Sequence, residues 1–484
     1  MNKNQLDILQ INTFDCYGGA EKIAWGLFKT YQQRGHGSWL AVGRKLAQDD
    51  HVFEIPKTAT SVPWARLCPG LHDRLIPNGN RTQALGRLCG WLRIMAQGIP
   101  AIQRELGWED FNFPGTRKML QSTPQRPDII HAHNLHANYF DLRYLPMLSH
   151  AVPLIVHLHD AWLLSGHCAH SFECNRWITG CGACPDLTIY PGIKRDATAW
   201  NWRRKKKIYA RSRLYIATPC NWLMDKVRKS MLMTGAQGCR VIPNGVDLAV
   251  FHPGEKQAAR AALGINQAAK VLLFAAHGIR DNIWKDYHSL RKAVALTDAN
   301  LQEGGITFIA LGEDAPPERI GNAEVCFVPP QQDPRRIACY YRAADMYVHA
   351  ARADTFPNTI LEALACGTPV VATAVGGIPE QIMSLGSSAA PDGLRLFAKE
   401  QATGILVPGG DPAALSAAIL ALAGDDELCR QLGVQAAQDA RARFSLERQA
   451  DAYLAWYQEI IEKESIHRQS APRSWRTDKK DALC

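Results

Sequence analysis

Two carboxylates stand eight residues apart in the segment DTFPNTILE, at Asp354 and Glu362. Asp354 follows an apolar run (345–350) that predicts a buried strand, and Glu362 falls in the first turns of a predicted helix. Carboxylate oxygens at such a place accept hydrogen bonds from neighbouring hydroxyl groups, such as those of a ribose or a hexose. The pair therefore predicts a hydroxyl-binding site. The alternative is structural, with Asp354 capping the helix and Glu362 complementing its dipole.

Two cations, Arg280 and Lys285, are spaced five residues apart in HGIRDNIWKDYHSL. This segment follows an apolar run (270–276) that predicts a strand, and it opens into a predicted helix. Fixed cations and the free amides of a helix N-terminus stabilise a departing diphosphate. The pair predicts an anion-binding loop, and two solvated surface cations are the alternative.

Histidines are concentrated in two predicted strands, 129–136 and 154–162. Alternation along a strand places His131 with His133 on one side, and His157 with His159 likewise. Polar residues at the carboxyl ends of parallel strands face the ligand crevice in α/β folds. We therefore expect the side chains of His133 and of His159, which Asp160 follows, to face this crevice and lie near the substrate. A hydrogen-bonded core histidine is the alternative.

The Gly18-Gly19 pair lies in GGAE, between a predicted strand and a predicted helix. Glycines let backbone amides approach an anion at a helix N-terminus. The segment lacks the full G-x-G-x-x-G pattern, which argues against a dinucleotide site. Anion binding and a simple tight turn both fit the pair.

Four cysteines cluster within 17 residues, at Cys168, Cys174, Cys181 and Cys184. Four thiols, one pair of them spaced C-x2-C, can surround a tetrahedral ion, so we predict a structural Zn²⁺ site. The other spacings are not those of a standard zinc ribbon. Reduced thiols, disulfides and an iron–sulfur cluster are the alternatives.

A basic run with aromatic neighbours, WNWRRKKKIYARSR, covers residues 200–213. On a helix its five consecutive cations would surround most of the surface, a composition that suits the headgroup layer of an anionic membrane. A solvated basic face is the alternative. No recognition motif for nucleic acid accompanies the run, so we expect no nucleic-acid partner.

The order of the elements predicts two α/β blocks. Strand-like apolar runs separated by helical patterns occur in both halves of the chain, at 6–14, 39–43, 126–134, 152–160, 270–278, 305–313, 323–329, 345–350 and 368–373. A loop-rich junction with Pro243, Asn244 and Gly245 separates the halves. This pattern predicts two doubly wound, Rossmann-like domains facing across a cleft, where ligands bind at the carboxyl ends of the strands.

Composition sets the remaining limits. The chain has 484 residues, of which 46% are hydrophobic and 21% charged, and these values exclude global disorder. The net charge of +9 permits attraction to acidic lipid or phosphorylated substrates. No apolar stretch is long enough for a spanning helix, and the first residues do not resemble a signal peptide. We expect a cytoplasmic protein whose cysteines are reduced.

The segment DTFPNTILEALACGTPVVATAVGGIPE (354–380) resembles the donor-site signature of GT-B glycosyltransferases of family 4. The likeness extends to IPNGVDLAVFHP (242–253) and to GGAE (18–21), and so covers most of the chain apart from about 50–115 and the tail. The family usually has Glu at the position of Asp354, so the charge here is set back by about one methylene. The block around the four cysteines further resembles family members from exopolysaccharide clusters of the colanic-acid type.

This resemblance implies roles for the candidate residues. Glu362 would hold the ribose of a nucleotide, and Asp354 would contact the hydroxyls of the donor sugar. Lys285 and Arg280 would stabilise the leaving diphosphate without a catalytic metal, and His159 would lie near the reaction centre. The remaining residues would border the sugar and the diphosphate: Phe356, Pro357, Asn358, Gly18 and Gly19.

The implied activity is retaining transfer of a sugar from a nucleotide diphosphate sugar to a lipid-linked oligosaccharide on the cytoplasmic face of the inner membrane. The expected organisation is an acceptor domain (1–235, with an insertion at about 50–115 and the cysteine cluster 168–184), a donor domain (236–445), a helix returning to the first domain (446–463), and a disordered tail (464–484). A nucleotide-sugar epimerase or a phosphorylase of the same fold, or a non-catalytic zinc-stabilised basic binding protein, are the alternatives.

Overall fold

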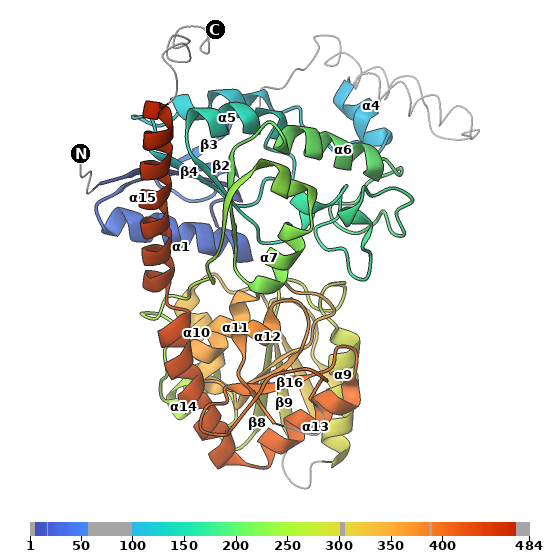
Figure 1. The fold of residues 1–484 in the computed structure, drawn as a ribbon. Helices are drawn as coiled ribbons and strands as arrows, with labels where there is room; N and C mark the ends of the chain where they lie inside the picture. Colours follow the sequence, from blue (N-terminus) through green and yellow to red (C-terminus); the bar gives the residue numbers. More distant parts are fainter. Residues whose placement is uncertain (1–4, 17, 57–98, 301–304, 387–389, 471–484) are drawn as a thin grey trace, which may run out of the picture.

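The computed structural model describes residues 5–16, 18–56, 99–300, 305–386 and 390–470, with side chains as far as residue 466. Most of the predicted insertion at 50–115 and the end of the predicted tail lie outside these residues. Two α/β domains stand one above the other, and a long C-terminal helix runs alongside the first domain (Figure 1). The prediction of two doubly wound domains is therefore confirmed.

The first domain is built on a seven-stranded parallel sheet in the order β3-β2-β1-β4-β5-β6-β7. Its strands are β1 (Asp7–Phe14), β2 (Gly37–Arg44), β3 (Val52–Glu54), β4 (Ile129–Ala132), β5 (Leu154–His157), β6 (Leu214–Thr218) and β7 (Ala236–Val241). The central strands are buried along their whole length, as expected for a parallel sheet covered on both faces. Its longer helices are α1 (Gly19–Gln33), α4 (Ile99–Glu105), α5 (Leu145–Ala151), α6 (Thr198–Tyr209) and α7 (Asn221–Arg228).

The second domain contains a nine-stranded sheet in the order β10-β11-β9-β8-β12-β13-β16-β14-β15. Its strands are β8 (Lys270–Ala275), β9 (Ile306–Leu311), β10 (Glu318–Ile320), β11 (Ala323–Val328), β12 (Met346–His349), β13 (Val370–Thr373), β14 (Ser384–Leu385), β15 (Leu396–Phe397) and β16 (Gly404–Val407). Its helices are α8 (Lys256–Leu263), α9 (Tyr287–Asn300), α10 (Pro334–Ala343), α11 (Asn358–Ala365), α12 (Ile378–Gln381), α13 (Pro412–Ala423) and α14 (Asp426–Arg443). Only β10 pairs antiparallel among the strands described.

The last helix, α15 (Leu446–Ser470), leaves the second domain and packs on the first. Its buried Tyr453, Trp456 and Tyr457 share a core cluster with Ile8 and Leu27 of the first domain. The Tyr457 hydroxyl also lies 3.1 Å from the Tyr31 hydroxyl of α1. The helix continues to residue 470, seven residues beyond the predicted end at 463, so the start of the expected tail is helical.

The structure places the junction between the domains later than residue 235. Strand β7 pairs in parallel with β6, from Leu214 with Ala236 to Thr218 with Val241, so it is the last strand of the first sheet. Burial of β7 is only partial because it forms the edge of the sheet. A short edge strand with Gly238 and polar residues does not give the continuous apolar pattern by which the sequence analysis identified strands.

Helix α6 contains the basic run, and one of its five cations points inward. Lys205 is completely buried, and its ammonium group donates to Glu109 Oε1 (2.8 Å) and to the carbonyl oxygens of Trp162 (2.9 Å) and Ser165 (3.2 Å). The ammonium also lies 3.7 Å from the centre of the Trp162 ring. The expectation that the cations surround the helix surface was therefore wrong at Lys205, because this ammonium joins three segments of the first domain.

Other side chains of α6 remain at the surface. Trp200, Arg203, Lys206 and Lys207 are exposed, whereas Arg204 is half-buried against the Phe111 ring. Within the part of the chain that the structure describes, no helix is both long and apolar enough to cross a membrane.

Replacing Lys205 by Met is expected to destabilise the protein strongly. The Glu109 carboxylate would remain buried without its counter-charge, and loss of one partner of a buried pair costs about 3–5 kcal/mol of unfolding free energy. Chemical denaturation of Lys205→Met beside Lys207→Met measures this loss. The exposed Lys207 variant should change stability by less than about 0.5 kcal/mol. Equal stability of the two variants would contradict the role assigned to Lys205.

Candidate active site

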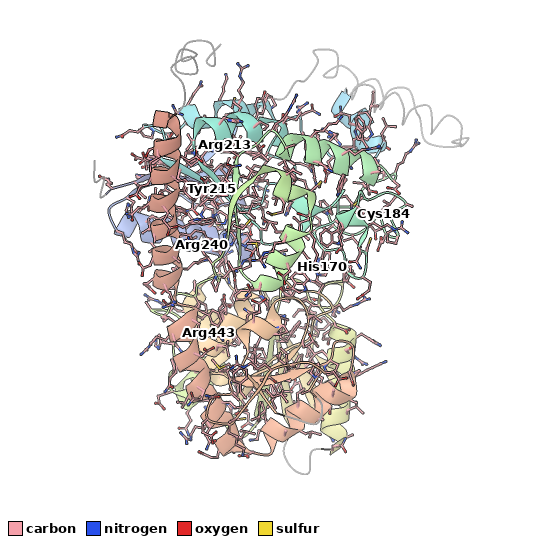
Figure 2. All side chains as sticks on the ribbon, in the orientation of Figure 1. His170, Cys184, Arg213, Tyr215, Arg240 and Arg443 are labelled. Atoms are coloured by element: carbon pink, nitrogen blue, oxygen red, sulfur yellow. The ribbon has the colours of Figure 1, made fainter. Side chains whose placement is uncertain are left out.

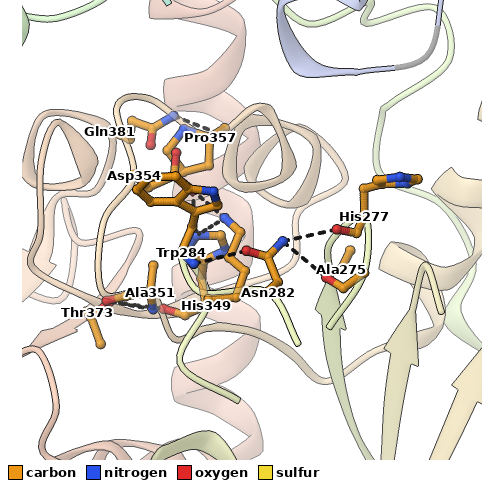
Figure 3. Close-up of polar contacts among 12 residues, drawn as sticks. Ala275, His277, Asn282, Trp284, His349, Ala351, Asp354, Pro357, Thr373 and Gln381 are labelled. Carbon is orange, nitrogen blue, oxygen red and sulfur yellow. Dashed lines mark hydrogen bonds and ion pairs between the residues drawn. The ribbon is translucent and has the colours of Figure 1, made fainter. Parts of the chain in front are cut away.

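Asp354, Lys285 and His349 form a charged cluster at the carboxyl ends of β8 and β12 (Figure 3). The Lys285 ammonium forms an ion pair with Asp354 Oδ2, and His349 Nε2 lies 3.3 Å from the same oxygen. His349 is fully buried, and the Tyr347 hydroxyl lies 3.0 Å from its Nδ1. The structure therefore brings together two of the predicted site residues, Asp354 and Lys285, and adds a histidine that was not predicted.

The backbone explains why these side chains meet. Strands β8 and β12 are neighbours, so the segments that follow them lie side by side. Lys285 forms an isolated antiparallel bridge with Ala351, and the Trp284 carbonyl accepts hydrogen bonds from the amides of Arg352 (2.9 Å) and Ala353 (3.3 Å). The lysine loop is thereby fixed against the segment that leads to Asp354.

The Asn282 side chain fixes the start of the same loop. Its amide donates to the carbonyls of His277 (3.0 Å) and Gly278 (3.3 Å), and its oxygen accepts from the Trp284 amide (3.0 Å). These contacts form a local asparagine turn, a conformation that Asn side chains favour. Figure 3 shows Asn282 with its contacts in this loop, and the loop leads directly from Trp284 to Lys285.

The electrostatics of the cluster keep Asp354 ionised. Burial raises the pKa of Asp354, but the Lys285 charge and the His349 hydrogen bond outweigh it, so the net pKa lies well below its usual range. Burial also lowers the pKa of His349 to about 4, and Lys285 acts in the same direction. At neutral pH the cluster is an ionised carboxylate beside an ammonium group and a neutral imidazole.

A glycine turn supports Asp354 from the other side. Gly376 has φ of 58°, and a side chain there would collide with the Asp354 carbonyl oxygen. The Gly377 amide donates to the Thr355 carbonyl at 3.0 Å. The Gly-Gly pair of the 354–380 segment is therefore required by close backbone approach.

Glu362 lies on α11 and faces the first domain. Its side chain is 6% exposed. Oε2 accepts from the Tyr341 hydroxyl (2.9 Å), and Oε1 pairs with the ammonium of Lys22 on α1 (3.1 Å). Both oxygens of the predicted ribose acceptor are thus engaged, one of them by the opposite domain.

The first residue of α11, Asn358, also contacts the first domain. The Asn358 amide donates to the Gly19 carbonyl (2.9 Å), and its oxygen accepts from Asn244 Nδ2 (3.1 Å). The Phe356 ring is buried 6.0 Å from the Phe444 ring, and the Pro357 carbonyl accepts from the buried Gln381 amide (3.0 Å). Of the residues predicted to border the sugar and the diphosphate, Asn358 faces the GGAE segment, whereas the Phe356 side chain packs in the core.

Arg280 is not part of the cluster among the described contacts. Its guanidinium pairs with Glu313, and the Glu313 carboxylate also accepts from the backbone amides of Ile279 (2.7 Å) and Arg280 (2.9 Å). The Arg280 side chain is 46% exposed and lies 5.2 Å from the centre of the Phe327 ring. The five-residue spacing therefore gives two loop cations with different partners.

The predicted histidines of the first domain form a stack of rings. His133 Nδ1 lies 3.0 Å from His159 Nε2, and His133 Nε2 lies 2.9 Å from Gln10 Oε1. His131 and His157 contact the hydroxyls of Tyr457 (2.6 Å) and Tyr453 (3.0 Å) on α15. Burial lowers the pKa of His159 to about 4, against the opposing effect of Asp160. Neutral imidazoles therefore run from the C-terminal helix to the strand end that carries His159.

Two groups of residues in the first domain have side chains that can ligate metals, the histidines of the sheet and the cysteine cluster. Ligand atoms of His131, His133 and His157 lie within 4.8 Å of one another. The His131 ring lies at 27° to His133 and 20° to His157, whereas His133 and His157 are tilted by 46°. Both ring nitrogens of His133 have hydrogen-bond partners, Gln10 and His159, so an ion bound there would break one of these contacts.

The cysteine cluster gives no preformed tetrahedral site among the described residues. No three of these thiols lie within 4.8 Å of one another. Cys184 contacts His167 Nε2 at 3.4 Å, and Cys181 accepts from the Gly166 amide at 3.3 Å. The four cysteines carry no disulfide. Zinc at this cluster stays a prediction.

Sequence reasoning missed several polar residues at the interface. The Glu380 carboxylate accepts from the backbone amides of Asn221 and Trp222, both at 2.8 Å, and so joins the second domain to the start of α7. Burial raises the pKa of Glu21, the acid of GGAE, to about 7, and Asp160 acts in the same direction. The only sequence signal for Glu21 and Glu380 was their position in the motifs GGAE (18–21) and 354–380. The only signal for His349 was its place at the end of a buried strand.

Two family models match this chain. Residues 17–250 match the model described as Glycosyltransferase Family 4, and residues 269–425 match the model described as Glycosyl transferases group 1. The two matches correspond to the two domains of the structure.

Named relatives agree with these matches. The chain is 35% identical over 415 residues to D-inositol 3-phosphate glycosyltransferase 1 of Catenulispora acidiphila, covering 83% of this chain and 84% of the relative. It is 27% identical over 258 residues to the colanic acid biosynthesis glycosyl transferase WcaC of Escherichia coli K12, covering 51% of this chain and 60% of WcaC. A D-inositol 3-phosphate glycosyltransferase of Segniliparus rotundus is matched over 47% of its length, at 33% identity over 46% of this chain.

Solved structures show the same fold. A sucrose-phosphate synthase from Thermosynechococcus elongatus superposes with a TM-score of 0.59 at 18% identity, covering 94% of this chain and all of that one. Anabaena HepE, in complex with UDP and glucose, superposes with a TM-score of 0.57 at 17% identity over the same shares. The glycosyltransferase WaaG gives 0.53 at 13% identity, covering 92% of this chain and 99% of WaaG.

The raised pKa of Glu21 makes stability depend on pH. The folded protein binds this proton more tightly than the unfolded chain, whose Glu has its ordinary pKa of 4.5. The unfolding free energy therefore falls as pH rises from about 4.5 through 7. The substitution Glu21→Gln removes the ionisable group and therefore this fall in the unfolding free energy at high pH. The variant should gain up to about 3 kcal/mol relative to the wild type at pH 8 and little at pH 4.5, because one pKa unit corresponds to about 1.4 kcal/mol. Denaturation at both pH values measures the difference, and an equal gain at both would contradict it.

Proposed function

Because the chain belongs to the family 4 (group 1) glycosyltransferases, with the GT-B fold, we propose that it transfers a sugar, with retention, from a nucleotide diphosphate sugar to a lipid-linked oligosaccharide in exopolysaccharide biosynthesis. The likeness to WcaC supports the polysaccharide role. The inositol-phosphate relatives support an acceptor that bears phosphate. Both acceptor classes therefore belong in the test.

One observation supports this function above the others. An ionised Asp354 is held by Lys285 at the strand ends of the second domain, and Glu362 faces the first domain on the next helix. A carboxylate that can accept hydrogen bonds from sugar hydroxyls and a cation that can bind diphosphate are thereby positioned in adjacent loops. Sugar-nucleotide transfer requires these two features.

We assign the donor contacts as follows. Glu362 accepts hydrogen bonds from the ribose hydroxyls after Lys22 leaves it, and Asp354 accepts from a hydroxyl of the donor sugar. Lys285 then turns its ammonium toward the diphosphate, and the amides at the start of α11 near Asn358 face the same anion. His159, held by His133, positions the donor or the acceptor from the first domain.

The reaction follows from these positions. The bond between the anomeric carbon and the diphosphate oxygen breaks, and the pair of electrons leaves with the diphosphate. The acceptor hydroxyl arrives on the same face, forms the new glycosidic bond, and gives its proton to the departing diphosphate. Lys285 stabilises the developing charge, an effect that is large where water is excluded. Because Arg280 is paired with Glu313, Lys285 is the main cation in this scheme. We propose that the step proceeds without a catalytic metal.

Lys285→Ala should lower kcat more than Glu362→Gln does. Lysine acts on charge that develops in the transition state, and loss of such a contact costs about 10²–10³ in kcat, whereas loss of a ribose contact mainly raises the KM for the donor. The measurement is acceptor-dependent release of nucleoside diphosphate from a panel of nucleotide sugars. The acceptors are a polyprenyl diphosphate monosaccharide and inositol 3-phosphate.

Lys285→Arg, which keeps a cation beside Asp354, serves as the control for folding and charge. An unchanged kcat in Lys285→Ala would remove the leaving-group argument. Interconversion of the nucleotide sugar without acceptor would point to an epimerase, and binding without turnover to a non-catalytic protein.

We further propose that α6 contacts an anionic membrane surface. Trp200, Arg203 and Lys207 recur at helical spacing on its exposed side, together with Lys206. An aromatic residue beside cations suits the headgroup layer, and each cation near such a surface contributes about 1 kcal/mol. This contact would hold the enzyme at the inner face of the membrane, beside a lipid-linked acceptor.

Arg203→Glu/Lys207→Glu should weaken binding to vesicles of phosphatidylcholine with phosphatidylglycerol by at least about tenfold, since two attractive charges become repulsive. Co-sedimentation measures the change, and vesicles of phosphatidylcholine alone give the background. Arg228→Glu/Lys229→Glu, at the exposed end of α7, makes the same change in net charge elsewhere. Equal binding by both double variants would exclude α6 as the membrane contact.

A further inference from the structure

Four rings join the cysteine-rich segment of the first domain to the loop that carries Lys285. Phe172 stacks on Trp284 with ring centres 5.3 Å apart and an angle of 5°, and His170 stacks on Trp222 at 5.6 Å and 13°. The edge of His170 also meets Phe172 at 5.0 Å and Trp284 at 6.1 Å. Trp284 belongs to the second domain and the other three rings to the first. Figure 2 shows His170 at the level where the domains meet.

The hydrogen bonds of His170 define which nitrogen carries its proton. The Phe172 amide donates to His170 Nδ1 at 3.0 Å, so Nδ1 holds a lone pair. In the neutral ring the proton is therefore on Nε2. Among the described residues, this Nε2 is buried and has no hydrogen-bond partner. A buried donor left unpaired costs about 1–3 kcal/mol, so this N–H is available to a partner from outside the chain, either water or a ligand.

The backbone at Phe172 is strained in a way that maintains this geometry. Its φ of 44° lies in the left-handed region, which is unfavourable for a residue with a bulky side chain. This conformation both presents the Phe172 amide to His170 and lays the Phe172 ring on Trp284. Strain of this kind persists where the surrounding structure requires it, often at binding sites.

The position of the cluster relates it to the reacting groups. Trp284 immediately precedes Lys285, and its carbonyl binds the segment 352–353 that leads to Asp354. Burial and the Lys226 charge lower the pKa of His170 to about 4, against the opposing charges of Asp354 and Asp160. The neutral His170 ring thus meets Trp284, the residue before Lys285, across the domain boundary.

We propose that His170, Phe172, Trp222 and Trp284 form a subsite for a sugar ring of the acceptor. The Nε2–H of His170 donates to an oxygen of that sugar, and the aromatic rings contact its C–H face. Three of the four rings come from the first domain, opposite the donor contacts, and this favours the acceptor over the donor sugar. The inference rests on the proposed function, because it needs a transferase with a separate acceptor.

His170→Phe keeps an aromatic ring and removes the N–H donor. With the polyprenyl diphosphate monosaccharide as acceptor, we expect the KM for the acceptor to rise about tenfold, the size of one lost hydrogen bond. The Kd for the nucleoside diphosphate should stay within about twofold of the wild-type value. His170→Gln, which retains an N–H donor, should recover part of the acceptor affinity.

His150→Phe, at an exposed position of α5, is the matched control and should leave both constants unchanged. An unchanged acceptor KM in His170→Phe, or an equal loss of nucleotide affinity, would overturn the subsite. So would loss of bound zinc from the variant by elemental analysis, because His170 would then be a metal ligand. Failure of the proposed function differs from all of these, since the wild type would then show no turnover with any donor.

Discussion

The ion pair between Lys285 and Asp354 is the interaction on which the site depends. A carboxylate buried beside a neutral imidazole would not remain ionised on its own, and the lysine supplies the charge that holds its pKa low. The lysine is in turn fixed by backbone pairing between its loop and the segment after β12. In the proposed function the same ammonium turns toward the entering diphosphate, while the backbone pairing holds its loop. The loop is therefore in place before a donor would bind, and the ion pairs of Lys285 and Lys22 rearrange on binding.

Contacts between the domains bring residues of the first domain to this site. Glu362 meets Lys22, Asn358 meets Gly19, and Glu380 holds the first amides of α7. Each involves a residue of the 354–380 segment, so the segment that would bind the donor also holds the first domain. Helix α15 adds a separate link by returning to the first sheet, where its tyrosines contact the histidine stack. Under the proposed function, donor binding would be coupled to the relative position of the domains, because the same residues would contact both the donor and the first domain.

The two-domain α/β fold could be predicted from local sequence patterns. Buried parallel strands give continuous apolar runs, and such runs recur between helical patterns in both halves of the chain. The motif 354–380 located Asp354 and Glu362, and the position after β8 located Lys285, since adjacent strands bring their following loops together. Edge strand β7 was not predicted, because a half-buried strand does not need a continuous apolar run. Lys205 was expected at the surface because helical spacing alone does not reveal a buried acid such as Glu109 on a distant segment.

The partners of the site cations show the same limit. Arg280 pairs with Glu313 and Lys22 with Glu362, contacts that join residues 33 and 340 positions apart. Spacing along the chain carries no signal for such pairs, so their geometry required the three-dimensional structure. The histidine at the end of β12 did have a signal, because it is a polar residue that ends a buried strand. That signal alone does not separate a site residue from a hydrogen-bonded core histidine.

A crystal structure of the wild-type protein with a bound nucleoside diphosphate would test the central claim most directly. The account predicts the ribose hydroxyls on Glu362, with Lys22 displaced, and the diphosphate within hydrogen-bond distance of the Lys285 ammonium. A nucleotide bound elsewhere, with the pairs Lys22–Glu362 and Lys285–Asp354 both intact, would contradict it.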